Sequence, residues 1–281
     1  MILHVTHNDM DGAGCAVLLK KFLDIADTVY LNYDEIDGFL IKNYNRYNKI
    51  VITDLSPTIE TAHFLKNYVE LFFIDHHMTS LELSKIIDSY HDTTKSATLL
   101  TYEWLQELGC DVKEYKAFAE VVNDYDMWHL KIDNSLVMNM FFSIVGIDRF
   151  VARFLKKPSI DFDDSEKMLL EIEEESKTKY LDNGLKNITF FEDVEKRRFA
   201  VIFAEKYNSE LGHHILKHTD AKYVFIINAQ KKKVSLRSKD DIDVSVIAVG
   251  NGGGGHKNAA GFTTDFDFCI NDFLKRCGVL A

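Results

Sequence analysis

Short, nearly continuous apolar runs alternate with longer segments of helical apolar spacing over the first 130 residues. Four of the apolar runs are predicted to be strands: residues 2–7, 28–33, 48–56 and 70–77. Four segments with helical spacing lie between or after them: residues 12–25, 58–69, 95–108 and 112–128. Strands that are apolar on both faces and alternate with helices are typical of a parallel sheet covered on both sides. The pattern therefore predicts an α/β domain over residues 1–130.

The pattern changes after residue 130. Residues 131–195 are predicted to form a helical connector, because their long acidic run is typical of a solvated helix face. From residue 196 to residue 281 strands and helices return, which predicts a second, smaller α/β domain with a mixed sheet. Its predicted strands cover residues 198–205, 221–228 and 232–238, and its predicted helices cover residues 208–219, 243–250 and 269–277.

Composition narrows the class of protein. The 281 residues are 46% hydrophobic and 27% charged, which is ordinary for a globular chain. No apolar run approaches the ~20 residues that span a bilayer, and no secretory signal opens the chain, so we expect no membrane partner. Four scattered cysteines without a CxxC pair indicate reduced thiols and a cytoplasmic location: Cys15, Cys110, Cys269 and Cys277. A net charge of −11 disfavours general attraction to long nucleic acids.

Acids and histidines gather where predicted elements end. They are His7, Asp9 and Asp11 after the first strand, Asp54 after the third, Asp75, His76 and His77 after the fourth, and Asp124 and Asp126 at the end of a helix. The carboxyl ends of parallel strands meet at one edge of a sheet, where ligands bind in open α/β folds. A single aspartate at a strand end is usually a turn former or helix cap. Several such clusters at successive ends favour a shared site.

Carboxylates that converge repel one another unless a cation lies among them. Two divalent ions fit this set of oxygen and imidazole ligands, with Mn²⁺ preferred and Mg²⁺ or Co²⁺ tolerated. The three side chains of "HNDMDG" point the same way if the strand continues through them, whereas a turn would divide them between two ions. Both arrangements remain open from the sequence.

Glycines dominate a segment near the C-terminus, "NGGGGHKNAAGF" (251–262). Successive glycines let backbone N–H groups approach an anion closely, and His256 and Lys257 add donors. Arg237, in the upstream "SLRS", offers a fork for a phosphate. A flexible linker is the alternative, but an amphipathic helix precedes the glycines and the packed "AAGF" follows them. The basic stretches 195–199 and 230–239 are either solvated strand edges or local phosphate-binding patches.

The motifs "HNDMDG", "VITDLS", "IDHH" and "NDYDMW", followed by "SLRS" and "GGGGHKNAAGF", resemble those of the DHH phosphoesterase superfamily with its DHH-associated C-terminal domain. The match runs over nearly the whole chain and is most similar to the nano-RNase (oligoribonuclease) members. The resemblance implies a two-metal site in which His7 and Asp9 bind one ion, Asp11 and His76 bind the other, and Asp54 bridges them. It implies one further ligand from "NDYDMW", with Asp126 favoured and Asp124 as the alternative.

The resemblance also implies supporting roles. Asp75 would orient a histidine, and His77 would face the scissile phosphate. Nucleotide binding would fall to residues of the second domain: Arg237, Ser238, Gly253, Gly254, Gly255, His256 and Lys257.

The implied function is a cytoplasmic phosphodiesterase that hydrolyses short RNA or DNA oligonucleotides, or linear dinucleotides such as pApA, to nucleoside monophosphates. It would extend to dephosphorylation of 3′-phosphoadenosine 5′-phosphate. An inorganic pyrophosphatase, a processive nuclease for long single-stranded DNA and a non-catalytic nucleotide-binding module are the rival interpretations. Base, sugar, chain length, the end attacked and the oligomeric state, a homodimer included, are left open by the sequence.

Overall fold

The computed structural model describes residues 1–239 and 241–264. The chain divides into two compact units, Met1–Glu171 and Ile172–Ala281, and the boundary falls within the long helix α8 (Asp164–Lys186). The helix predicted at residues 269–277, with Cys269 and Cys277, lies outside the described residues.

The first unit is built on a five-stranded sheet in the order β2-β1-β3-β4-β5. Its strands are β1 (Ile2–His7), β2 (Ile25–Leu31), β3 (Lys49–Thr53), β4 (Glu70–Asp75) and β5 (Asp88–His91). All four neighbouring pairs are parallel, so the prediction of a parallel sheet is confirmed. The strand β5 escaped prediction because its four residues, DSYH, form a polar edge without an apolar run.

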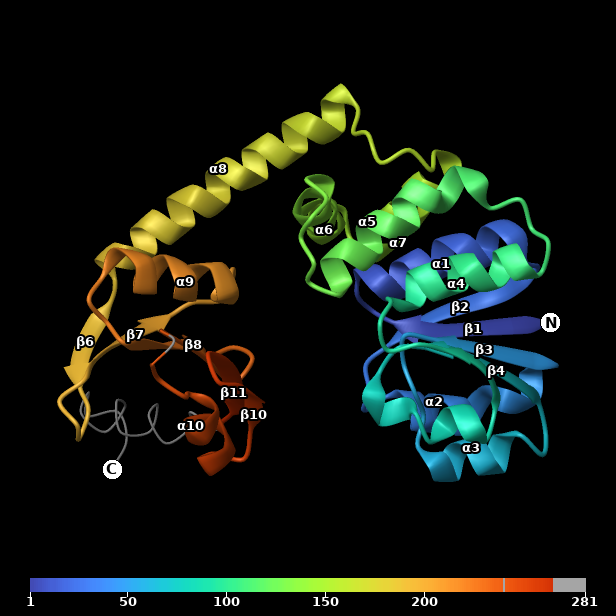
Figure 1. Ribbon diagram of the computed structural model, residues 1–281, viewed down its shortest axis with the longest axis horizontal. Helices are drawn as coiled ribbons and strands as arrows, with labels where there is room; N and C mark the ends of the chain where they lie inside the picture. Colours follow the sequence, from blue (N-terminus) through green and yellow to red (C-terminus); the bar gives the residue numbers. More distant parts are fainter. Residues whose placement is uncertain (240, 265–281) are drawn as a thin grey trace, which may run out of the picture. The chain divides into compact units, whose positions relative to one another are not determined.

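Helices cover both faces of this sheet (Figure 1). One face carries α1 (Met10–Phe22), α4 (Ala97–Glu107), α5 (Lys116–Asp126), α6 (Asn134–Val145) and α7 (Ile147–Lys156), which share one hydrophobic core. The other face carries α2 (Ile36–Asn43), which was not predicted, and α3 (Ile59–Leu65). The first unit therefore belongs to the α/β class, as the sequence predicts.

The predicted connector, residues 131–195, is shared between the units. Four phenylalanines of α5, α6 and α7 pack together in the core of the first unit: Phe118, Phe141, Phe150 and Phe154. Later in the segment, Tyr180 and Leu185 of α8 pack on the core of the second unit. Among the described helices none is alone long and apolar enough to cross a membrane, and the only pair that passes by length and composition, α6 with α7, is bent by 120°.

The second unit holds a six-stranded mixed sheet in the order β10-β11-β9-β8-β7-β6. Its strands are β6 (Thr189–Glu192), β7 (Arg198–Phe203), β8 (Tyr223–Asn228), β9 (Lys233–Ser238), β10 (Gly254–His256) and β11 (Ala259–Thr263). Among these described strands, only β7 and β8 pair in parallel. The helix α9 (Asn208–His218) covers one face and α10 (Ser245–Gly250) packs on the other. The mixed sheet is as predicted, although β6, β10 and β11 were not predicted as strands.

Close packing of α1 against α4 depends on Gly14. A Cβ atom at this position would lie 2.2 Å from Thr98 Oγ1. That hydroxyl cannot move freely, because it donates a hydrogen bond of 2.7 Å to the carbonyl oxygen of Asp11. Gly14 therefore lets the first turns of the two helices approach, which in turn places Asp11.

We predict opposite effects for alanine at two helical glycines. Gly14→Ala should lower the free energy of unfolding by about 1–3 kcal/mol, because the new methyl group overpacks the α1–α4 contact. Gly38→Ala in α2 is the matched control, since nothing lies within 4 Å of its Cβ position; it should raise stability by about 0.5–1 kcal/mol. Urea unfolding followed by circular dichroism measures both, and shifts of the same sign would contradict the packing argument.

Candidate metal centre

The sheet order brings the carboxyl ends of β1, β3 and β4 side by side. His7 is the last residue of β1, Asp54 directly follows β3, and His76 directly follows β4. Asp54 has a left-handed backbone with φ of 53°, a conformation that costs a non-glycine residue about 1–3 kcal/mol. This strained turn points the buried carboxylate of Asp54 at its neighbours on both sides.

A turn divides the acids of "HNDMDG". Asp9 caps the N-terminus of α1 by accepting a 3.0 Å hydrogen bond from Gly12 N. Its other oxygen, Oδ2, lies 2.7 Å from His7 Nδ1, and that nitrogen lies 3.9 Å from Asp54 Oδ2. His7, Asp9 and Asp54 thus form one group whose ligand atoms all lie within 4.8 Å of one another.

Asp11 belongs to a second group, one turn into α1. Its ligand atom lies within 4.8 Å of those of His76 and Asp126. His76 Nε2 is central, at 3.3 Å from Asp54 Oδ1, 3.6 Å from Asp126 Oδ2 and 3.9 Å from Asp11 Oδ2. The first turn of α4 fixes the carboxylate of Asp11, which accepts hydrogen bonds from Ala97 N (2.7 Å) and Thr98 N (2.8 Å).

The donor set fits divalent cations. Asp54 faces the first group with Oδ2 and the second with Oδ1, and its Oδ2 and Asp126 Oδ2 are buried oxygens without a hydrogen-bond partner. Burial, followed by the charges of Asp11 and Asp9, raises the pKa of Asp54 well above its usual range and that of Asp126 to about 8. Burial also raises the pKa of Asp11. Cations between such carboxylates would offset both burial and repulsion.

Asp75 and His77 form a third group with Asp54 and His76, whose ligand atoms also lie within 4.8 Å of one another, and they contact each other. Asp75 Oδ1 accepts a 2.8 Å hydrogen bond from His77 Nδ1. Burial raises the pKa of Asp75, but the hydrogen bond from His77, the charge of His77 and further hydrogen bonds from Ser80 and His76 together outweigh it and leave the pKa below its ordinary value. The hydrogen bond between Asp75 and His77 is the main reason that the pKa of His77 is raised. The pair is therefore an ionised carboxylate that orients an imidazole.

Tyr33 also reaches this edge, and the sequence reasoning missed it. Its hydroxyl lies 3.0 Å from His77 Nε2, and its ring centroid lies 4.9 Å from that of His7. The signal was present, because the predicted strand 28–33 ends at the same edge of the sheet as the other three. The structure ends β2 at Leu31, so Tyr33 lies in the loop after the strand.

The two acids of "NDYDMW" have different surroundings. Asp124 is buried and accepts hydrogen bonds from Lys131 N and Ile132 N, both at 3.0 Å, and from the hydroxyl of Ser135. These donors belong to the loop after α5 and the start of α6, so Asp124 holds that loop. Asp126 alone joins the second group of candidate ligands.

In the second unit, Arg237 and His256 share one face of the sheet. Ala259 of β11 pairs directly with Arg237 of β9 on one side and with His256 of β10 on the other. Residues directly opposite in antiparallel strands point to the same face, and two strand spacings are about 10 Å. Arg237 Nη2 donates a 2.7 Å hydrogen bond to Ser209 Oγ in the first turn of α9. This face therefore presents a guanidinium and an imidazole together.

Two of the glycines in the segment 251–262 are needed by the fold itself, whether or not a ligand binds there. A Cβ on Gly253 would lie 2.2 Å from Gly261 O, and one on Gly255 would lie 2.5 Å from Ala260 Cα, whereas Gly254 has open space. The backbone N–H of Gly253 already donates a 2.9 Å hydrogen bond to the carbonyl oxygen of Ala248. Close pairing of β10 with β11 thus requires Gly253 and Gly255.

Of the other two residues predicted to bind nucleotide, Ser238 is engaged within the fold and Lys257 is exposed. Ser238 Oγ donates to the carbonyl oxygen of Ile242 at 2.7 Å and accepts from Asn258 Nδ2 at 3.1 Å, so this hydroxyl is used within the fold.

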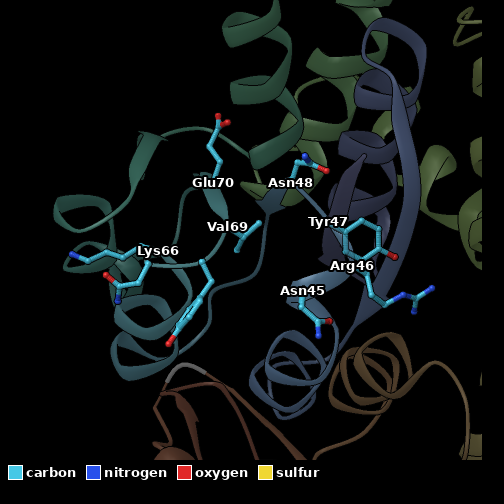
Figure 2. Close-up of a pocket in the computed structure, with 9 residues that line it drawn as sticks. Asn45, Arg46, Tyr47, Asn48, Lys66, Val69 and Glu70 are labelled. Carbon is cyan, nitrogen blue, oxygen red and sulfur yellow. The ribbon is translucent and has the colours of Figure 1, made fainter.

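A surface pocket of about 580 Å³ lies elsewhere on the first unit. It is lined by residues 45–48 and 66–70, which precede or begin β3 and β4 (Figure 2). The pocket thus lies at the amino edge of the sheet, opposite the candidate metal ligands.

The chain belongs to the DHH superfamily of phosphoesterases and carries a DHHA1 domain, whose family matches residues 203–277. It is 34% identical to oligoribonuclease NrnB of Bacillus subtilis (strain 168) over 290 aligned positions, which cover 91% of this chain and 71% of the relative. The superfamily expected from the motifs is thereby confirmed.

Solved structures share the fold. The pGpG-specific phosphodiesterase PggH from Vibrio cholerae superposes with a TM-score of 0.60 at 13% identity, covering 99% of this chain and 98% of that one. Exonuclease RecJ bound to manganese gives a TM-score of 0.57 at 17% identity, covering 98% and 88%. At these identities the likeness shows the α/β fold alone.

We predict that substitutions of Asp124 and Asp126 have different effects, one on stability and the other on metal binding and activity. Asp126→Asn should lower activity and Mn²⁺ affinity by orders of magnitude, because it removes a ligand charge. Asp124→Asn should cost about 1–3 kcal/mol of stability, because the amide nitrogen cannot accept the hydrogen bonds of the loop, and should change Mn²⁺ affinity little. Titration calorimetry and thermal unfolding of both variants measure this, and the reverse ranking of Mn²⁺ affinities would move the ligand to Asp124.

Proposed function

We propose that the chain is a metal-dependent phosphodiesterase that hydrolyses short oligonucleotides and linear dinucleotides to nucleoside monophosphates. The observation that carries the proposal is the position of Asp54, whose two carboxylate oxygens face two separate groups of Asp and His side chains. A carboxylate shared by two ions ~3.5–4 Å apart is the arrangement used for displacement at phosphorus.

The ligands divide between the two positions. His7 and Asp9 would hold one ion, Asp11, His76 and Asp126 the other, and Asp54 would bridge them. Two ions bound there, with Mn²⁺ preferred, would supply Lewis acidity toward the phosphoryl group and lower the pKa of an attacking water.

The other residues of the edge prepare the substrate for reaction. His77, oriented by Asp75, would donate a proton or a hydrogen bond to the leaving oxygen.

The second unit would bind the end of the substrate. Arg237 and His256 lie on one face of its sheet, and a charged fork beside an imidazole suits a terminal phosphate. The relatives agree with short substrates, since one is named an oligoribonuclease and another a pGpG-specific phosphodiesterase. A cytoplasmic location fits RNA turnover and the unpaired thiols of Cys15 and Cys110.

The first test is metal dependence. We expect EDTA to abolish hydrolysis of pApA and Mn²⁺ to restore it best. Asp54→Asn should lower kcat/KM by about 10³-fold, ~4 kcal/mol, because both ions lose a shared ligand, and calorimetry should show weakened binding of two ions. Asp88→Asn, at the exposed start of β5, is the matched control. Full activity in chelator, or an Asp54→Asn enzyme with normal turnover, would refute the two-metal site.

The second test concerns substrate length. Arg237→Ala should lower kcat/KM for pApA by about ten- to a hundredfold, the value of a charge-assisted hydrogen bond. The generic diester bis-p-nitrophenyl phosphate has no terminal phosphate, so its hydrolysis should change little. Arg198→Ala, which removes another arginine of this unit, paired with Asp220, is the control.

Equal losses on both substrates would assign Arg237 to folding or general catalysis. Hydrolysis of pyrophosphate in place of pApA would favour the pyrophosphatase interpretation, and binding of pApA without any hydrolysis would favour a non-catalytic module.

A further inference from the structure

Tyr33 lies at the carboxyl edge of the first sheet without belonging to any of the groups of candidate ligands. Its side chain is exposed by 52%, yet it contacts two functional histidines. The hydroxyl lies 3.0 Å from His77 Nε2, the ring meets the His77 ring edge-on at 5.9 Å, and it lies 4.9 Å from the His7 ring.

The loop that carries Tyr33 is held in place by hydrogen bonds. Glu35 Oε2 accepts from Asn32 N at 2.7 Å and from Asn32 Nδ2 at 2.8 Å. Asn32 Oδ1 in turn accepts a 3.0 Å hydrogen bond from Asn8 Nδ2, and Asn8 lies between the candidate ligands His7 and Asp9. The loops after β1 and β2 are therefore tied together, which fixes where Tyr33 stands.

The contacts of His77 define its tautomer. An ionised carboxylate only accepts hydrogen bonds, so the 2.8 Å contact with Asp75 Oδ1 makes Nδ1 the protonated nitrogen. Nε2 of the neutral ring is then an acceptor, and the Tyr33 hydroxyl donates to it. With a partner on each nitrogen, the ring can neither rotate nor exchange tautomers without breaking a hydrogen bond.

We propose that Tyr33 is a positioning residue, which acts through His77 by holding its imidazole in the orientation and tautomer that the reaction uses. This role rests on the proposed phosphodiesterase function. The Tyr33 hydroxyl contacts Nε2 while Asp75 engages Nδ1, so the imidazole is held from both sides. Tyr33 is thus coupled to catalysis without binding a metal or contributing to the chemistry itself.

The kinetic test is Tyr33→Phe, which keeps the ring and removes the hydroxyl. Loss of one hydrogen bond should lower kcat for pApA about two- to tenfold and leave KM unchanged, because the contact is with His77 and not with substrate. In a His77→Gln background the same change should have no further effect. Tyr68→Phe, at another exposed tyrosine, is the control and should behave as wild type.

A second readout is independent of turnover. Ring ¹⁵N NMR of the Mg²⁺-loaded protein, with the His77 signals assigned by their absence in His77→Gln, should show a single Nδ1–H tautomer in wild type. In Tyr33→Phe the two ring nitrogens should move toward averaged shifts. Failure of wild type to hydrolyse any phosphodiester would refute the proposed function, while these spectra would still decide whether Tyr33 fixes His77.

Two results would overturn the proposal. One is a Tyr33→Phe protein with wild-type His77 shifts and wild-type kcat. The other is an equal loss of activity from Tyr33→Phe in the wild-type and His77→Gln backgrounds, which would mean that Tyr33 acts on the substrate directly.

Discussion

Repulsion among buried carboxylates at the carboxyl edge of the first sheet is the constraint on which the rest of the site depends. Asp11, Asp54 and Asp126 are each raised in pKa by burial and by neighbouring acids. The fold nevertheless holds them together, at a left-handed turn, at the first turn of a helix and at the end of another. Such an arrangement is stable in ionised form only with cations between the oxygens. The strain and the charge together identify this edge as the place where function is concentrated.

Residues of one type are given different tasks by the donors around them. Asp124 and Asp126 are two positions apart, but backbone amides and a hydroxyl surround the first, while the second has a buried oxygen without a partner. Asp75 lies between these two cases: its Oδ1 is engaged by His77 and serves to orient that ring, whereas its Oδ2 is buried without a hydrogen-bond partner. An acid whose lone pairs are already used supports structure. An acid with an unused, buried oxygen is prepared for a ligand.

The proposed chemistry and the proposed substrate selection belong to separate units of the chain. Among the residues that the structure describes, the first unit carries the candidate metal ligands, and the DHHA1 domain carries Arg237 and His256 on one face of its own sheet. The glycines beside His256 are needed for β10 to pair closely with β11. Their part in the proposed binding is therefore indirect, because they build the edge strand that carries His256.

The sequence by itself determined the α/β class, the parallel sheet and the acid and histidine clusters, because apolar periodicity and strand-end chemistry are local properties. Tertiary structure alone decided which atoms meet. The choice between Asp124 and Asp126 depends on a loop folding back from residues 131–135, and the contact of Tyr33 with His77 joins residues 44 positions apart. The strand β5 and the division of residues 131–195 between two cores were equally hidden. Each depends on neighbours distant in sequence, and no local pattern records them.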